Sequence, residues 1–451
     1  MSELRVAVVG GGLAGLAAGV ACADAGARVT LLEARPRLGG ATWSTQHQGL
    51  AIDNGQHVFL RCCTAYRGFL ERIGAQDRVA LQSRLAIPVV APAGRTAWLR
   101  RHRLPAPLHL APSLARFAHV SWPDRLRIAA AARRLAQLDL ADPALDQRSF
   151  GEWLARAGQS PRAIDRFWDL VIRPTLNAGA GEASLALAAM VFQTGLLRQS
   201  DAADVGWARV PLAQVHAEPA ARALAERGVE VMLRARVRGI ELEAGGVAGI
   251  RLETRRIPAD AVILATPHAE AAELLPVESG IDTRALAALE SSSIVNLHVV
   301  WDRPVLAHAF AAAVDSPLQW IFDRTEASGL AIGQYLAVSL SAADAWVGVS
   351  AGALRRRFEP EFRRLFPAAR AARLTKLFVT SEPAATFRQA PGSQRLRAAT
   401  QTRVAGLYLA GAWTDTGWPA TMEGAVRSGL AAARAALAAA DRRQGLPQVA
   451  A

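Results

Sequence analysis

The stretch Gly10-Gly11-Gly12-Leu13-Ala14-Gly15 decides the fold of this chain. It follows an apolar run, Leu4 to Val9, that is typical of a β-strand, and it opens an alanine-rich segment that is typical of a helix. A second strand is predicted from Arg28 to Leu32, and Glu33 stands at its end. This order of strand, glycine turn, helix, strand and acidic residue predicts a dinucleotide-binding βαβ unit.

Each glycine of the motif has its own task in such a unit. Gly10 permits a tight turn, Gly12 lets the backbone approach a pyrophosphate, and Gly15 lets the helix pack closely on the strand. The free amides at the start of the helix are expected to donate hydrogen bonds to phosphate oxygens. Glu33 is expected to accept hydrogen bonds from ribose hydroxyls.

The size and composition of the chain narrow its class. A length of 451 residues predicts two domains, and 51% hydrophobic with 20% charged residues indicates a globular protein. The net charge of +13 comes almost entirely from arginine, because Lys376 is the only lysine. No nucleic-acid recognition motif accompanies this charge. We therefore expect no nucleic-acid partner and regard an anionic membrane surface as the better candidate.

Cysteine and histidine usage argues against disulfides and metals. Cys22, Cys62 and Cys63 form no CxxC pair, and the nine histidines show no metal-binding spacing. The apolar run 14–25 contains Asp24 and follows a glycine turn, so it is predicted to be the first helix and no signal peptide is expected. No stretch reaches ~18 uninterrupted apolar residues. These features predict a cytoplasmic protein that is peripheral at the inner face of the cell membrane.

A candidate membrane-facing segment lies at 114–138. It carries apolar side chains such as Phe117 and Trp122 among several arginines, a composition that suits an anionic lipid surface. The alternative is a solvated arginine face over the core. A second apolar stretch, 186–197, is a candidate wall for a hydrophobic tunnel, although such a stripe is also typical of an ordinary core.

Periodicity predicts the remaining elements. Residues 105–197 are mostly helical in pattern and are divided by prolines, and a basic amphipathic helix is predicted at 353–365. Further helices are predicted at 220–226 and 424–440. Further strands are predicted from 229, within 251–265, and at 294–301, 318–322, 335–340 and 407–410.

The residues after Glu33 carry a family resemblance. Arg35-Pro36-Arg37-Leu38-Gly39-Gly40 resembles the second dinucleotide signature of FAD enzymes of the amine oxidase and phytoene desaturase superfamily. In that family the signature runs along the pyrophosphate and ribityl chain of the flavin. The strand 236–240 is similar to the one whose valine, here Val237, meets the adenine. The segment 407–429 resembles the C-terminal FAD motif of the superfamily.

The order of these motifs along the whole chain implies a fold and a cofactor. We predict an α/β protein with a discontinuous Rossmann-type FAD-binding domain, residues 1–75, 206–285 and 396–451. An α+β substrate domain, 76–205 and 286–395, is inserted and contains a mixed sheet and a helical subdomain. FAD is expected to bind non-covalently. The predicted cofactor-binding residues are Gly10, Gly12, Leu13, Ala14, Gly15, Glu33, Ala34, Arg35, Arg37, Gly39, Gly40, Ala41, Val237, Gly411, Ala412, Met422 and Glu423.

Three other segments, 53–66, 167–177 and 414–421, resemble hydroxysqualene dehydroxylases. The resemblance implies a hydrophobic isoprenoid substrate, whose hydroxyl leaves as water while reduced flavin supplies a hydride. A carotenoid or phytoene-type desaturase remains an alternative, as does a prenyl-lipid carrier of the same fold. A flavin amine oxidase is less favoured, because the slot of its lysine holds Asn296 and the chain has only three tyrosines.

The expected chemistry requires a proton donor, because hydroxide is a poor leaving group. Asp53 and His57 lie four positions apart just past the flavin signature, and either is a candidate donor. Arg173 and Asn177 are candidates for polarising the hydroxyl, whether they lie on one helical turn or beside a helix that starts at Pro174. No separate NAD-binding motif is present, so the sequence does not indicate which electron donor reduces the flavin.

Overall fold

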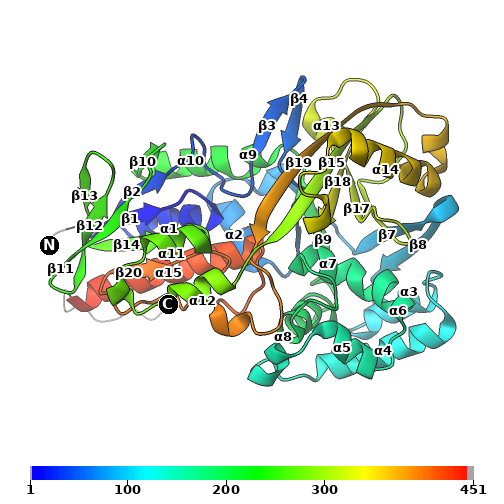
Figure 1. Ribbon diagram of the computed structural model, residues 1–451, viewed down its shortest axis with the longest axis horizontal. Helices are drawn as coiled ribbons and strands as arrows, with labels where there is room; N and C mark the ends of the chain where they lie inside the picture. The colour runs from blue at the N-terminus through cyan, green and yellow to red at the C-terminus, as the bar shows by residue number, and fades with distance from the viewer. Residues whose placement is uncertain (1–2, 444–451) are drawn as a thin grey trace.

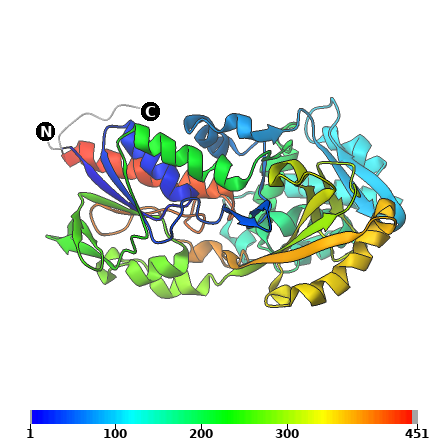
Figure 2. The ribbon, with the colours of Figure 1, turned by 90° about the horizontal axis from the view of Figure 1, so that it is seen from above.

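The computed structural model describes residues 3–443, so the last eight residues assigned to the FAD-binding domain lie outside the described part. The molecule is elongated (Figures 1 and 2). A parallel sheet with its helices forms one end, and a larger mixed sheet with a helical subdomain forms the other. Within residues 3–443, no helix is both long and apolar enough to cross a membrane.

The first sheet is the predicted Rossmann-type sheet. Its five strands have the order β10-β2-β1-β14-β20, and every neighbouring pair is parallel. The bounds are β10 Glu230–Leu233, β2 Arg28–Glu33, β1 Arg5–Val9, β14 Ala261–Leu264 and β20 Leu407–Leu409. These strands come from three separate parts of the chain, as the prediction of a discontinuous domain requires.

Both faces of this sheet are covered, which explains why β1 is apolar at successive positions. Val6 and Val8 face one cluster, formed with α1 Leu13–Asp24, α10 Ala217–Glu226, α2 Thr64–Arg72 and α15 Met422–Arg443. Ala7 and Val9 face a second cluster, formed with α11 His268–Leu274, α12 Thr283–Ala288 and the small antiparallel sheet β11 Gly239–Glu243, β12 Gly246–Arg251 and β13 Arg256–Pro258.

The second sheet has seven strands in the order β19-β15-β18-β17-β16-β7-β8. It is mixed, because β16 and β7 are parallel while its other pairs are antiparallel. The bounds are β19 Leu374–Thr386, β15 Ser292–Trp301, β18 Gln334–Ser341, β17 Trp320–Asp323, β16 Phe310–Ala313, β7 Ala86–Ala91 and β8 Arg95–Arg100. The predicted amphipathic helix is confirmed as α14 Ala351–Leu365, which buries Leu354, Phe358 and Phe362 against this sheet.

The predicted helical subdomain packs around Phe150, Trp168 and Phe192. Its helices are α3 Ala111–Ala115, α4 Trp122–Ala136, α5 Phe150–Arg156, α6 Pro161–Ala163, α7 Asp169–Leu176 and α8 Leu185–Phe192. All eight residues of α8 are buried in this cluster, so the stretch that was a candidate tunnel wall forms core here.

Short elements connect the two ends. They comprise β3 Ser44–His47 with β4 Leu50–Asp53, the sheet β5-β9-β6 (Val58–Leu60, Val205–Ala208, Val79–Leu81), α9 Leu212–Val215 and α13 Thr325–Ser328.

The α/β class with an inserted mixed sheet is confirmed, whereas the domain limits stay a prediction. Four of the seven mixed-sheet strands, β7, β8, β16 and β19, were not predicted, although β19 has 13 residues. The burial pattern of β19 is mostly intermediate, without the alternation that marks a strand in the sequence.

Candidate functional site

Two glycine segments form a cradle at the start of α1. Gly12 is the N-cap of this helix, no side chain caps it, and no acidic residue stands in its first turn. Its first amides, at Leu13, Ala14 and Gly15, are therefore available to an anion. Gly40 lies so close that an added Cβ would be 2.7 Å from the Cα of Gly12. The positive φ of Gly40, 56°, and this contact both require glycine, and the cradle fits a dinucleotide phosphate.

Glu33 closes one side of the cradle. One carboxylate oxygen accepts the amide hydrogen of Gly11 at 2.7 Å, and the other accepts that of Arg35 at 2.7 Å, which fixes the turn at Ala34. The Ala235 amide donates to the carbonyl of Glu33, so the segment that leads to the buried Val237 is held beside the same strand end. Carboxylate oxygens carry further lone pairs, so Glu33 retains acceptor capacity for a ribose.

Arg37 turns back onto the glycine pair. Its Nη1 donates to the carbonyl of Gly40 at 3.1 Å, and its guanidinium lies 4.5 Å from the Trp43 ring centroid. Burial, followed by the charge of Arg35, lowers the pKa of Arg37 from its usual value. The Gly39 amide donates to the carbonyl of Gly11, which joins the two predicted signatures directly.

The C-terminal motif is fixed from both sides. The Gly411 amide donates to the hydroxyl of Ser428 in α15 at 2.8 Å. The buried Arg397 donates to the carbonyls of Ala412 and Thr414. Burial lowers the pKa of Arg397 to about 10. Sequence reasoning missed Arg397, because the sequence around an arginine in an irregular segment does not indicate which carbonyls its guanidinium binds.

The first turn of α15 is anchored to the start of α2. Met422 begins the helix and packs against the cluster around α1. The carboxylate of Glu423 is buried and accepts the amide hydrogens of Ala65 and Tyr66, at 3.1 and 2.7 Å, and a bond from Arg427 at 2.7 Å. Glu423 thus holds the start of α2 against α15.

Asp53 is held by three kinds of donor. Its Oδ1 accepts from the Ser44 hydroxyl at 2.6 Å and from the Leu212 amide at 2.8 Å. Its Oδ2 pairs with Arg324 Nη2 at 2.9 Å. Arg324 also donates to the carbonyls of Ala208 and Val210. Both partners are almost completely buried.

His57 lines a small cavity next to this pair. The walls are mostly apolar or aromatic and comprise Gln56, His57, Val58, Trp207, Ala208, Leu212, Ala309, Phe322, Asp323 and Arg324. Burial lowers the pKa of His57, while the carboxylates of Asp53 and Glu382 and the backbone of Ala41 act to raise it. His57 therefore lies between two anionic groups and beside the flavin signature.

Glu382, on β19, is a site residue that sequence reasoning missed. Its Oε1 accepts from Trp43 Nε1 and from Asn54 Nδ2, both at 3.0 Å. The only sequence signal was an acidic residue within an otherwise weakly charged strand. The structure brings Glu382 next to the 41–57 segment from more than 300 positions away.

Asn296 occupies a buried position behind Gly55. Its Nδ2 donates to the carbonyl of Asn54 at 2.8 Å, and its Oδ1 is buried with no hydrogen-bond partner among the described residues. The Thr380 hydroxyl donates to the same Asn54 carbonyl at 2.9 Å. This position therefore presents a neutral amide to the segment 54–55.

The structure does not bring Arg173 and Asn177 to His57. Arg173 pairs with Asp169 at 2.6 Å and lines a separate polar cleft between α7 and the segment 313–320. Asn177 is the C-cap of α7, so the alternative helix start at Pro174 is wrong. Its side chain bonds to the Ser292 carbonyl, the Thr386 hydroxyl and the Ala342 amide, which occupies both ends of the amide.

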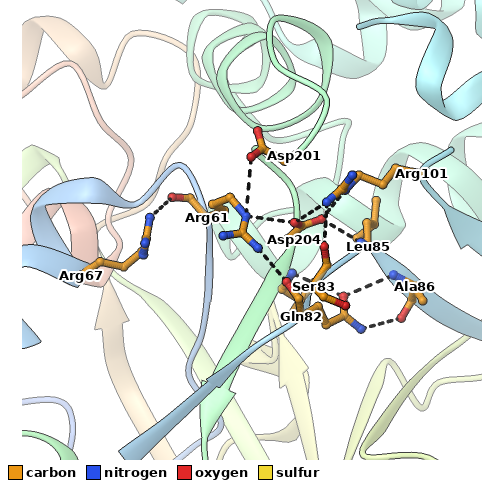
Figure 3. Close-up of polar contacts among 10 residues, drawn as sticks. Arg61, Arg67, Gln82, Ser83, Leu85, Ala86, Arg101, Asp201 and Asp204 are labelled. Atoms are coloured by element: carbon orange, nitrogen blue, oxygen red, sulfur yellow. Dashed lines mark hydrogen bonds and ion pairs between the residues drawn. The ribbon is translucent and has the colours of Figure 1, made fainter. Parts of the chain in front are cut away.

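A buried aspartate fixes one cavity wall (Figure 3). Asp204 accepts two bonds from Arg101, one from Arg61 at 2.9 Å and one from the Leu85 amide at 2.7 Å. Burial acts to raise the pKa of Asp204, but the bonds from Arg101 and Arg61 outweigh it and lower the pKa. Asp204 directly precedes β9, whose Trp207 lines the cavity.

A dinucleotide cradle at the start of the first helix of a parallel sheet, combined with an inserted mixed sheet, defines an FAD-dependent oxidoreductase. Comparison with known families agrees, because residues 13–437 match the family described as flavin containing amine oxidoreductase. The chain belongs to this family, and FAD is its cofactor.

Two proteins have similar sequences along nearly their whole length, and one solved structure has a similar fold. The chain is 30% identical to a hydroxysqualene dehydroxylase from Rhodopseudomonas palustris over 441 residues, 96% of this chain and 98% of that protein. It is 26% identical to a zeta-carotene desaturase from Synechocystis, over 98% and 99% of the two chains. A solved putrescine oxidase bound to putrescine has the same fold, with a TM-score of 0.72, 20% identity and coverage of 97% and 100%.

Proposed function

We propose that this protein reductively removes the hydroxyl group of hydroxysqualene to give squalene. The observation that carries the proposal is the similarity to hydroxysqualene dehydroxylases along nearly the whole chain. Apolar and aromatic side chains that include Trp207 and Phe322 lie beside His57 and agree with a hydrocarbon substrate, which must open the cavity of about 10 Å³ that they line. The neutral Asn296, where amine oxidases carry a lysine, agrees with a substrate other than an amine.

The reaction balances with one hydride and one proton. The carbon–oxygen bond breaks, the oxygen leaves as water after receiving a proton, and a hydride takes its place on carbon. FAD in its two-electron reduced form supplies the hydride and is oxidised. The protein must therefore supply the proton, exclude water and stabilise positive charge on the allylic carbon.

We assign the proton to His57. It lines the cavity; burial lowers its pKa, and the carboxylates of Asp53 and Glu382 act against that shift and favour the protonated form. Asp53 acts as a positioning residue, because its oxygens are already bound by Ser44, Leu212 and Arg324. The rings of Trp207 and Phe322 offer π faces to a developing cation. Arg173 and Asn177 are proposed to maintain the helical subdomain and its junction with the mixed sheet.

The test is anaerobic. The purified holoprotein is reduced with dithionite and mixed with hydroxysqualene, while the oxidised flavin band is followed and products are extracted. Reoxidation with formation of squalene is expected, and His57→Gln is expected to slow reoxidation by about 100-fold while FAD remains bound. Flavin that stays reduced in the presence of hydroxysqualene would overturn the proposal. Bleaching of the oxidised protein by a polyene precursor would then indicate a desaturase.

A further inference from the structure

Positive charge is concentrated in one part of the substrate domain. Residues 95–136 contain a single acidic residue, Asp124, which is buried and accepts a hydrogen bond from the Ser121 hydroxyl. The exposed charges of this segment are therefore positive. Its nine arginines are Arg95, Arg100, Arg101, Arg103, Arg116, Arg125, Arg127, Arg133 and Arg134.

The arginines of this segment have fewer acidic partners than those of the other basic helix, α14. In α14, four arginines form ion pairs with Glu359 and Glu361. In the segment 95–136, only Arg101 and Arg127 form ion pairs, both with buried aspartates. Most of the positive charge of this segment is thus available to an external partner.

Large apolar side chains are exposed in the same segment. Trp122 is 61% exposed and Leu126 is 68% exposed, and they lie four positions apart on α4. Leu104 and Leu108 are also exposed and belong to the loop that leads into α3. We call these four residues the docking patch. Exposed apolar side chains rimmed by cations are typical of a surface that rests on an anionic bilayer.

Helix α3 links the loop of Leu104 and Leu108 to α4. Helix α3 packs against α4. The guanidinium of Arg125 donates to the carbonyl of Ala115, at the end of α3, and lies 4.6 Å from the ring centroid of Trp122. Figure 1 shows α3 and α4 at the outer end of the helical subdomain, away from the nucleotide-binding sheet.

The docking patch is also connected to the cavity. Arg101, at the start of the loop, is anchored on Asp204, which precedes the strand of Trp207 (Figure 3). Leu110, at the end of the loop, packs in the cluster that contains Phe322 and Trp207. The loop that carries Leu104 and Leu108 thus contributes, through Leu110, to the apolar cluster at the cavity wall, which suits a substrate that dissolves in the hydrocarbon of a membrane.

We infer that the docking patch binds the surface of an anionic lipid bilayer, with the apolar side chains inserted and the arginines on the lipid headgroups. The lipid origin of the substrate rests on the proposed function, but binding of the protein to the bilayer does not. The test therefore uses the holoprotein and vesicles without substrate. If the protein does not bind the vesicles, the proposed reaction is unaffected, and if the proposed reaction fails its own test, the inference about vesicle binding is unaffected.

The experiment is flotation with phosphatidylcholine vesicles, with or without phosphatidylglycerol. Binding is expected only with phosphatidylglycerol and is expected to weaken with added salt. Trp122→Ser with Leu126→Ser is expected to lower the partition coefficient at least tenfold, roughly what the loss of two inserted apolar side chains implies. Replacement of Arg103, Arg133 and Arg134 by glutamine is expected to weaken binding to a similar extent.

Matched controls lie outside the docking patch. Val277 and Ile332 are 95% and 83% exposed, so Val277→Ser with Ile332→Ser removes comparable apolar surface and is expected to leave binding unchanged. Equal binding to neutral vesicles, or equal losses in the patch and control variants, would overturn the inference. A patch variant that changes the sedimentation mass but not vesicle binding would also overturn it and would assign the patch to contacts between copies of the chain.

Discussion

Arg324 and Asp53 form an ion pair of 2.9 Å whose side chains are only 7% and 4% exposed. The pair joins the end of β17 to the end of β4, and Arg324 also donates to the carbonyls of Ala208, the last residue of β9, and Val210. One buried guanidinium thus holds together the three segments that surround His57. A buried pair of this kind fixes a geometry, and the loss of either partner leaves an uncompensated charge.

Removal of the cation should therefore destabilise the protein. Arg324→Met is expected to lower the free energy of unfolding by about 3–5 kcal/mol, because the Asp53 carboxylate remains buried without its partner. The double variant Asp53→Asn with Arg324→Met should recover part of this loss. Denaturant unfolding of the holoprotein measures both. The control is Arg238→Met, since the Arg238–Glu253 pair is exposed, and a comparable loss there would contradict the argument.

Gly40 tests the cofactor cradle. A methyl group at Gly40 would lie 2.7 Å from the backbone of Gly12, in the space that the two glycine segments share. Gly40→Ala is expected to yield protein with little bound FAD, measured as the ratio of flavin to protein absorbance. Gly49→Ala is the matched control, because Gly49 also has a positive φ, 81°, but meets nothing within 4 Å. Equal flavin loss in both variants would point to backbone strain instead of the cradle.

Glu382 is expected to act through the proton affinity of His57. Its carboxylate raises the pKa of His57 against the effect of burial, so Glu382→Gln should lower that pKa. Less His57 is then protonated at pH 7, and dehydroxylation should slow, with the descending limb of its pH profile shifted to lower pH. Stopped-flow reoxidation across pH gives the profile. Glu253→Gln, an exposed carboxylate, should leave it unshifted, and a rate loss without a shift in Glu382→Gln would exclude this role.

The nucleotide half of the site could be predicted from sequence because its signals are local. The motif 10–15, Glu33 and the pair Gly39–Gly40 lie within one βαβ unit, where spacing alone determines proximity. The half of the site around the cavity could not be predicted from sequence. Arg324 and Glu382 reach Asp53 and Asn54 only because β17 and β19 lie in one mixed sheet, and strand pairing between distant segments leaves no mark in a single sequence.

Helix positions were predicted better than side-chain roles. The 3.6-residue period located α14 because one face is buried on a sheet. The same reasoning could not decide whether α8 forms core or tunnel, because a wholly apolar segment has no preferred face. It also could not decide the role of Glu423, because the α2 amides that this carboxylate binds are more than 350 positions away.

Two buried histidines should make the protein sensitive to acid. Burial lowers the pKa of His216 and of His298 to about 3, and the neighbouring His57 and His47 act in the same direction. The rings are held neutral by Tyr66 in the first case, and by Tyr335 and Thr380 in the second. Below about pH 6.5 the unfolded chain binds protons at these positions and the folded chain does not.

Stability should therefore fall as the pH drops from about 6.5 towards 3, by roughly 1.4 kcal/mol per pH unit for each histidine. His298→Gln removes one of the two groups, and its free energy of unfolding should depend less steeply on pH by that amount, whatever its value at pH 7. Denaturant unfolding at pH 7, 6 and 5 measures the slope. His308→Gln, at an exposed position, should keep the wild-type slope. If His298→Gln keeps it as well, His298 takes up protons in the folded state, and its hydrogen bonds to Tyr335 and Thr380 do not hold it neutral.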